Sequence, residues 1–88
     1  KDYKEAVRLY RLSAEQGLAQ AQHNLGVMHA LGQGVPQDYA SAHMWLSISI
    51  SNGYEDAVSS KNIVEKEMTP PQIEKAQKMA RNWKPTTK

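Results

Sequence analysis

Apolar side chains recur along this chain at intervals of three and four residues, the spacing that places them on one face of an α-helix. Residues 2–16 follow it, with Asp2 as the expected N-cap and Gly17 as the residue that ends the helix. Residues 19–31 follow it as well, and their inward stripe consists of Leu18, Ala21, Leu25 and Met28. The pattern therefore predicts two helices in the first part of the chain.

A turn and a third helix come next. Residues 32–37, GQGVPQ, combine two glycines with a proline, so we expect a turn there and a new helix over residues 38–52. Within that helix, residues 46–51 read LSISIS, an alternation that is typical of a β-strand. The same positions 36 residues earlier read YRLSAE, which is a helical pattern, so the helix remains the prediction.

The end of the chain predicts two further helices. Residues 54–68 repeat the role of residues 19–31, although Lys61 and Asn62 stand where the earlier helix has Leu-Gly. Residues 69–83 open on TPPQ, which supplies a Thr N-cap, prolines for the first turn and a capping-box Gln. The inner stripe of this last helix consists of Ile73, Ala76, Ala80 and Trp83.

The chain also repeats itself with a period of 36 residues. Sliding it by this period superposes identical residues: Asp2 on Asp38, Tyr3 on Tyr39, Ala6 on Ala42, Ser13 on Ser49 and Gly17 on Gly53. A period of this length is typical of a solenoid, in which each helical unit buries its apolar face by stacking on its neighbour. We therefore expect an all-α solenoid of about five helices.

One repeat domain is expected over residues 1–83. It divides into the second helix of a truncated repeat (1–17), a complete repeat (18–53), a degenerate first helix (54–68) and a C-terminal capping helix (69–83), followed by a flexible tail (84–88). Because the chain opens with Lys1 inside a repeat and not with Met, we expect it to be a piece of a longer protein.

The central unit carries small, aromatic and turn residues in a fixed order: Ala21, Leu25-Gly26, Gly32, Gly34-Val35, Asp38, Ala42, Trp45 and Gly53. In this order and spacing it resembles the Sel-one-like repeat, a relative of the tetratricopeptide repeat. His29 and Ser49-Ile50 depart from the family pattern. The resemblance implies a right-handed α-superhelix that serves as a protein-interaction scaffold, with the first helices lining a concave surface. Residues 69–83 also resemble the closing helix of bacterial proteins that end in such repeats.

Composition excludes several kinds of chemistry. The chain has 88 residues, 40% of them hydrophobic and 23% charged, which is ordinary for a globular domain. No apolar run approaches the roughly 20 residues that span a bilayer, so we expect no membrane segment. The absence of Cys excludes a disulfide framework and a cysteine zinc site. Cytoplasmic, periplasmic and secreted locations all stay open.

Charge is unevenly distributed behind a formal net charge of +2. No Lys or Arg occurs over residues 12–60, whereas Glu15, Asp38, Glu55 and Asp56 lie there. Basic residues gather at both ends, and no aromatic platform for bases accompanies them. We interpret them as solvated faces and expect no nucleic-acid partner; weak nucleic-acid binding through the basic last helix stays an alternative.

No catalytic or metal-ligating constellation is evident. None of the serines lies in a nucleophile elbow, so a hydrolase related to the cysteine-rich repeat proteins that act on β-lactams is kept only as an alternative. His23 and His29 lie about 120° apart around one predicted helix, and His43 lies on another. We therefore expect no enzyme activity, no metal and no cofactor.

The expected function is binding of a protein or peptide on the concave first-helix face. The candidate contact residues lie opposite the packing stripe of the two first helices, and they are Gln20, His23, Asn24, Val27, Leu31, Asp56, Ser59, Ser60 and Ile63. Self-association through the truncated N-terminal helix is also expected. In the core, Trp45 is expected to fill the gap that Gly26 leaves on the facing helix.

Overall fold

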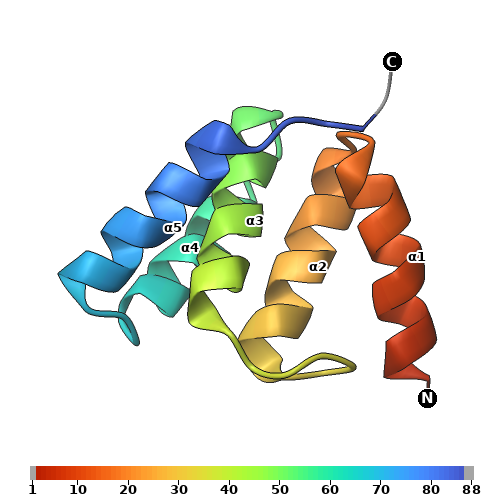
Figure 1. Ribbon diagram of the computed structural model, residues 1–88, viewed down its shortest axis with the longest axis horizontal. Coiled ribbons are helices and arrows are strands. Elements are labelled where there is room, and N and C mark those ends of the chain that lie inside the picture. The colour runs from red at the N-terminus through yellow and green to blue at the C-terminus, as the bar shows by residue number, and fades with distance from the viewer. Residues whose placement is uncertain (1, 87–88) are drawn as a thin grey trace.

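The computed structural model describes residues 2–86 and is built of α-helices (Figure 1). They are α1 (Tyr3–Glu15), α2 (Ala19–Leu31), α3 (Tyr39–Ser51), α4 (Ala57–Glu65) and α5 (Pro70–Asn82). Over the described residues there is no β-strand, and no helix is long and apolar enough to cross a membrane. The predicted all-α repeat fold is confirmed.

The helix starts follow the capping residues. The Asp2 carboxylate accepts a hydrogen bond from the backbone N–H of Glu5 at 3.0 Å, and the Asp38 carboxylate accepts one from Ser41 at 3.2 Å. Thr69 and Gln72 form the predicted capping box, in which each side chain bonds the other residue's backbone N–H. Three of the five helices are therefore fixed at their N-termini by local sequence.

Helix α3 contains the strand-like LSISIS segment, and that segment is helical. The reason is its position, because α2, α4 and α5 all pack against α3. A helix covered on several sides needs apolar or small side chains around most of its circumference. Leu46, Ile48 and Ser49 are accordingly all buried, although they point in different directions.

Helix α4 is shorter than predicted. A helix was expected over residues 54–68, but α4 is confined to Ala57–Glu65 and follows a turn. The Asp56 side chain makes no cap hydrogen bond, so nothing in the side chains extends the helix toward Tyr54.

Two hydrophobic clusters hold the helices together. The first joins α1, α2 and α3, and its buried members are Val7, Ala14, Ala21, Leu25, Met28, Trp45 and Ile48. The second joins α2, α3 and α4, and its buried members are Ala42, Leu46, Ala57 and Val64, with Ala30 of α2 packed against them. Helix α2 thus contributes to both clusters.

The gap opposite Gly26 is filled by Leu46 and not, as predicted, by Trp45. A Cβ atom on Gly26 would lie 2.9 Å from Cγ of Leu46 and 3.1 Å from the carbonyl oxygen of Ala42. Trp45 instead faces the first cluster, where its ring meets that of Trp83 edge-on at a centroid distance of 5.7 Å. The error was one helical position, about 100° around α3.

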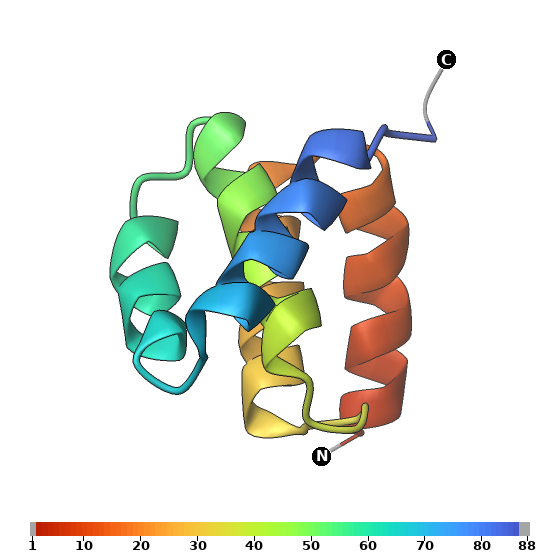
Figure 2. The same cartoon turned by 60° about the vertical axis from the view of Figure 1, so that its left-hand side comes forward.

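Helix α5 lies across α3 and does not pair with α4 in the way α3 pairs with α2 (Figure 2). The chain after α5 then runs back to the end of α1. There the backbone N–H of Thr86 donates a hydrogen bond to the carbonyl oxygen of Glu15 at 2.8 Å. Residues 84–86 were expected to be mobile, whereas in the structure they tie α5 to α1; residues 87–88 lie outside the described part of the chain.

Candidate functional site

The exposed side of α2, between α1 and α4, carries depressions that most of the predicted contact residues line, and we call this side the α2 face. The first depression, which we call the α1–α2 groove, lies between these two helices. Two adjoining hollows that share Tyr10 and Asn24 form it. Their lining is Asp2, Tyr3, Ala6, Tyr10 and Ser13 on the α1 side, with Leu18, Ala19, Gln20, Ala21, His23, Asn24, Val27, Met28 and Gln33 opposite.

A second depression lies between α2 and α4. It is lined by Val27, Ala30, Leu31, Leu46, Ser60, Ile63 and Val64. Leu31 and Ile63 flank it and stay 60% and 65% exposed, which makes them the most exposed large apolar side chains of the described chain. Val27 lines this depression as well as the α1–α2 groove, so the depression and the groove share one wall.

His23 connects α2 to α4 across this surface. Its Nε2 lies 2.9 Å from the hydroxyl of Ser60, and its ring lies 5.1 Å from that of Tyr54. Nδ1 of His23 is buried and has no protein partner within the described residues. His23 and Ser60 therefore hold the two helices in register, and each also lines a hollow of the α2 face.

A second polar cluster joins α3 to α4 away from the α2 face. His43 is fully buried, and its Nε2 lies 2.7 Å from a carboxylate oxygen of Glu65, which also binds the Lys61 ammonium at 3.1 Å. The hydrogen bond from His43, followed by the one from Lys61, holds the pKa of Glu65 below its ordinary value, although burial opposes this. The cluster joins α3 to α4 and so orients α4.

The family of the chain follows from its repeats. The Sel1 repeat model matches residues 1–18 and 19–54, which together are more than half of the chain. The chain belongs to the Sel1 repeat family. No curated protein matches it. Sel1 repeats generally mediate protein–protein interaction and are typically non-enzymatic scaffolds.

The Sel1 repeat fold brings most of the predicted contact residues together. Gln20, Asn24 and Val27 line the α1–α2 groove, while Leu31 and Ile63 line the depression beside α4. Asp56 and Ser59 are exposed but line neither the α1–α2 groove nor the depression beside α4. Asp56 lies in the turn before α4, which begins at Ala57, and Ser59 lies on a side of α4 that does not line the hollows.

Sequence reasoning missed the wall that α1 contributes. Tyr3 and Tyr10 line the groove, although the helical spacing of residues 2–16 distinguished them in no way from the other apolar residues of that helix. Their spacing of seven residues, two helical turns, places both on one side of α1. This shared side was the only sign in the sequence that the two rings act together. It was not recognised, because Ala6 lies on the same side of the helix and the whole row resembled an ordinary packing stripe.

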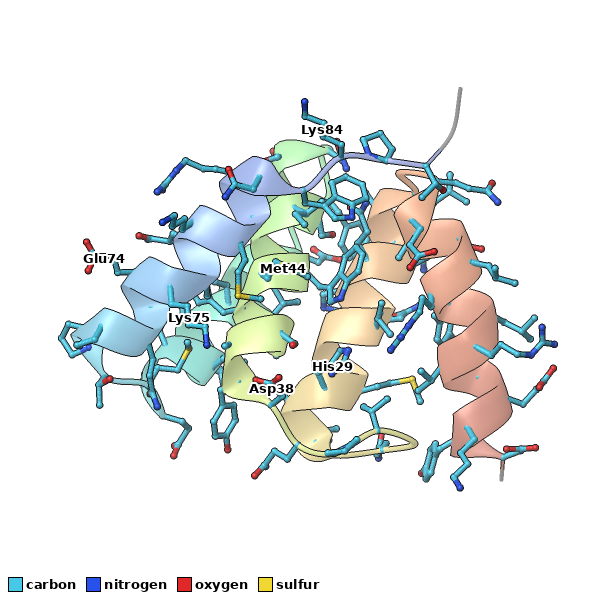
Figure 3. All side chains as sticks on the ribbon, viewed as in Figure 1. His29, Asp38, Met44, Glu74, Lys75 and Lys84 are labelled. Atoms are coloured by element: carbon cyan, nitrogen blue, oxygen red, sulfur yellow. The ribbon has the colours of Figure 1, made fainter. Side chains whose placement is uncertain are left out.

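Two other titratable residues of this Sel1 domain lie at the turn end of α2 and α3. His29 and Asp38 lie close together there (Figure 3). Burial, then the positive charge of Arg11, lowers the pKa of His29, while Asp38 acts in the opposite direction. Burial would raise the pKa of Asp38, but hydrogen bonds from the side chain and backbone of Ser41 and the backbone of Ala40 lower it on balance. No three His, Asp or Glu residues of the described chain converge as metal ligands do.

Proposed function

We propose that this Sel1 repeat domain binds a protein or peptide segment along the α2 face, with the α1–α2 groove as the main contact. The proposal rests on the lining of that groove, which combines aromatic rings, aliphatic groups and amide side chains. Tyr3, Tyr10 and Val27 offer apolar contact, while Gln20 and Asn24 offer donors and acceptors. Such a mixture suits a protein surface, where apolar burial supplies affinity and a few polar groups fix the register.

Charge favours a basic or neutral segment. The groove lining includes Asp2 but no Lys or Arg. No Lys or Arg occurs anywhere over residues 12–60, so no cation of α2 or α3 is available to hold a carboxylate. Acidic segments would therefore bind less well than basic ones, and the difference should shrink as salt is raised.

Affinity should be modest, because the groove is short. A surface smaller than a standard interface supports dissociation constants on the order of micromolar or weaker unless neighbouring repeats add contacts. A sensitive binding measurement is therefore needed to test the proposal.

The test is a selection of displayed peptides against the whole chain, followed by mapping of backbone amide shifts with a selected peptide. We expect shifts around Tyr10, Asn24 and Val27. The double change Asn24→Ala with Val27→Ala should weaken binding about tenfold while the melting temperature changes little.

A matched control lies in the separate hollow between α3 and α5, which Ser51 of α3 and Gln77 of α5 both line. The double change Ser51→Ala with Gln77→Ala should leave affinity unchanged. If the shifts gather around Ser51 and Gln77, and only this second double change weakens binding, the proposed α2 face is wrong.

A further inference from the structure

The turn that follows α3 contains the dipeptide Asn52-Gly53. Asn52 is the C-cap residue of α3, and Gly53 has a positive φ of 97°. Both residues are exposed, and a Cβ atom on Gly53 would have no heavy atom beyond its chain neighbours within 4 Å. The backbone nitrogen next to Asn52 is therefore unobstructed, and water reaches the turn freely.

The side-chain amide of Asn52 is the outer member of a chain of hydrogen bonds that reaches α1. Its Nδ2 donates to Oε1 of Gln22 at 3.0 Å, and Nε2 of Gln22 donates to the carbonyl oxygen of Ala14 at 3.0 Å. Gln22 is fully buried. Because a carbonyl oxygen can only accept, Ala14 determines which end of the Gln22 amide faces Asn52, and Oε1 then requires a donor. The last turn of α1 is thus held in part through an N–H group of residue 52.

We propose that Asn52 is a site of spontaneous deamidation, restrained by its hydrogen bond to Gln22, and that the product releases the end of α1. This property of the chain does not depend on what binds to the α2 face. Asparagine is among the thermolabile residues of proteins, and glycine after it leaves its side-chain amide open to attack.

The reaction needs only water. The Gly53 nitrogen attacks Cγ of Asn52 and forms a new C–N bond, while the side-chain NH₂ group takes the proton of the Gly53 amide and leaves as ammonia. Water then opens the five-membered succinimide at one of its two C–N bonds. One opening gives an aspartate, and the other gives an isoaspartate, in which the backbone runs through the side-chain carboxyl carbon. Asparagine and water thus yield aspartate or isoaspartate and ammonia.

The folded turn slows this reaction without preventing it. The N–H of Gly53 donates to the carbonyl oxygen of Ile50 at 2.9 Å, and the ψ angle of 13° at Asn52 turns the Gly53 nitrogen away from Cγ. The attack therefore requires that the last turn of α3 opens and that the bond between Asn52 and Gln22 breaks. Both are local events at an exposed helix end, where opening costs far less than global unfolding.

The three other asparagines of the chain serve as internal controls. Asn24, Asn62 and Asn82 lie within α2, α4 and α5, and they are followed by Leu, Ile and Trp. Side chains of this size obstruct the approach of the backbone nitrogen to Cγ, and helical hydrogen bonds hold that nitrogen in place. These three residues should therefore react more slowly than Asn52.

The repeat supplies a closer comparison at the end of α1. Gln16 and Gly17 lie one period before Asn52 and Gly53, and both glycines have a φ of 97°. Glutamine has an additional CH₂ group, so its reaction would have to close a larger ring, which forms more slowly. Within residues 2–86 the Gln16 side chain makes no hydrogen bond, so position 16 also lacks a restraint like that of Gln22 on Asn52.

An aspartate at position 52 cannot replace the amide. Its ionised carboxylate has no hydrogen to donate, so the buried Gln22 either loses its bond to residue 52 or turns over and loses its bond to Ala14. The new charge also lies at the C-terminal end of α3, where the helix dipole is negative, and Glu55 and Asp56 follow closely. Deamidation should therefore free the last turn of α1 from α2.

The first experiment ages the whole chain at body temperature and mildly alkaline pH and maps its peptides by mass spectrometry. Deamidation adds one mass unit, and isoaspartate is detected by enzymatic methylation. We expect both products to accumulate at Asn52 while Asn24, Asn62 and Asn82 stay intact. Equal rates at all the asparagines would overturn the proposal. So would an intact Asn52 in the folded chain after the isolated peptide of residues 47–57 has reacted.

Two variants test the restraint on the reaction. Gln22→Leu removes the acceptor that holds the Asn52 amide, so Asn52 should react severalfold faster, and unchanged rates at the other asparagines would show that the chain stays folded. Gln16→Asn places an unrestrained asparagine before Gly17, and it should react faster than Asn52. If it reacts no faster, or if Gln22→Leu leaves the rate at Asn52 unchanged, the restraint by Gln22 is wrong.

The effect of the product is tested with Asn52→Asp. This variant should melt roughly 4–10 °C below the parent, and the backbone amides of residues 11–17 should exchange hydrogen faster. Asn52→Gln is the matched control, because it keeps a side-chain donor and should gain no mass on ageing. Its amides should exchange as those of the parent do. If Asn52→Asp also exchanges like the parent, residue 52 does not hold α1 and the proposed release is wrong.

Discussion

At the scale of single residues, Gly26 determines how closely α2 approaches α3. Replacing it with Ala should gain up to about 1 kcal/mol of helix propensity. The new Cβ would, however, lie 2.9 Å from the branched Cγ of Leu46 and 3.1 Å from a backbone oxygen. Neither atom is the free end of a flexible chain, so the helices must separate, at a cost of about 1–3 kcal/mol.

We therefore expect Gly26→Ala to lower the free energy of unfolding, measured by urea denaturation. The same change in a Leu46→Ala background should cost less, because the nearer of the two obstacles is gone, and the difference gives the coupling between the two positions. A Gly26→Ala variant more stable than the parent would show that the contact is loose.

Asp38 tests the start of α3. Its carboxylate accepts hydrogen bonds from the N–H and the hydroxyl of Ser41 at 3.2 and 2.8 Å, so Asp38→Ala should cost about 1 kcal/mol. The pKa of Asp38 is lower in the folded chain than its ordinary value of 3.8. The ionised carboxylate therefore stabilises the fold above that pH, and this contribution is lost as the pH falls through the lowered pKa.

The difference in melting temperature between the parent and Asp38→Ala should accordingly be full at pH 6 and shrink as the pH falls below about 4. Asp38→Asn keeps a side-chain acceptor without a charge and serves as the control, with a smaller and pH-independent loss. A gap between parent and Asp38→Ala that stays constant down to pH 3 would exclude the ionised cap as its source.

At the scale of helices, α5 packs against α3 because α4 lacks the apolar residues that would hold a following helix beside it. Helix α2 presents Leu25 and Gly26 to its partner, whereas α4 has Lys61 and Asn62 at the equivalent positions. A Lys that pairs with Glu65 cannot form the close apolar contact that seats a following helix. Helix α5 therefore packs across α3, and Trp83 extends this contact to Trp45.

Trp83, the C-cap residue of α5, packs against the first cluster together with Ala80. Because Trp83 is only partly buried, Trp83→Ala should cost about 2–3 kcal/mol, somewhat less than the 3–5 kcal/mol typical of a fully buried Trp. Thermal melting followed by circular dichroism measures the loss. Trp83→Phe keeps an edge-on ring partner for Trp45 and should recover about half of it.

Residues 84–86, which we call the C-terminal strap, are tested separately by shortening the chain after Trp83, since this removes both hydrogen bonds of Thr86 to Glu15. The expected loss is about 1 kcal/mol. If Trp83→Ala melts with the parent while this shortened chain does not, the strap and not the ring holds α5 in place.

At the scale of the whole molecule, the 36-residue period accounts for most of what the sequence predicted. Each unit buries its stripe on the next, so the pattern alone indicated five helices and the stripe of α5 that contains Ala76. The period fails where the second unit departs from the first, which is why the short α4 and the path of α5 were not predicted. The register within a helix was the other limit, since Trp45 and Leu46 are both apolar and adjacent, and only packing distinguishes their directions.

The candidate site was predicted in part for a related reason. Helical spacing placed Gln20, Asn24 and Val27 on an exposed face, and they line the groove. The pattern could not say that Tyr3 and Tyr10 complete it, because a helix stripe looks the same whether or not a neighbouring helix covers it. Whether a neighbouring helix covers a given stripe is decided only when the whole chain has folded.

Apolar residues that no neighbouring helix covers are also the expected cause of self-association. Leu9 and Leu12 lie one turn apart on α1, are each 50% exposed and line neither hollow of the α1–α2 groove. Exposed apolar pairs of this kind favour contact with a second molecule. Lys4 and Arg11 on the same helix repel another copy, so we expect association to be weak and to increase with salt as that repulsion is screened.

Light scattering over a range of protein and salt concentrations measures this association. The double change Leu9→Ser with Leu12→Ser should abolish it, whereas Ile63→Ser, which removes an apolar side chain that is 65% exposed on α4, should not. A chain that stays monomeric at millimolar concentration in high salt would contradict the prediction. Because Leu9 and Leu12 lie outside the α1–α2 groove, the double variant should still bind a peptide selected for that groove, which separates the contact between copies from the contact with a partner.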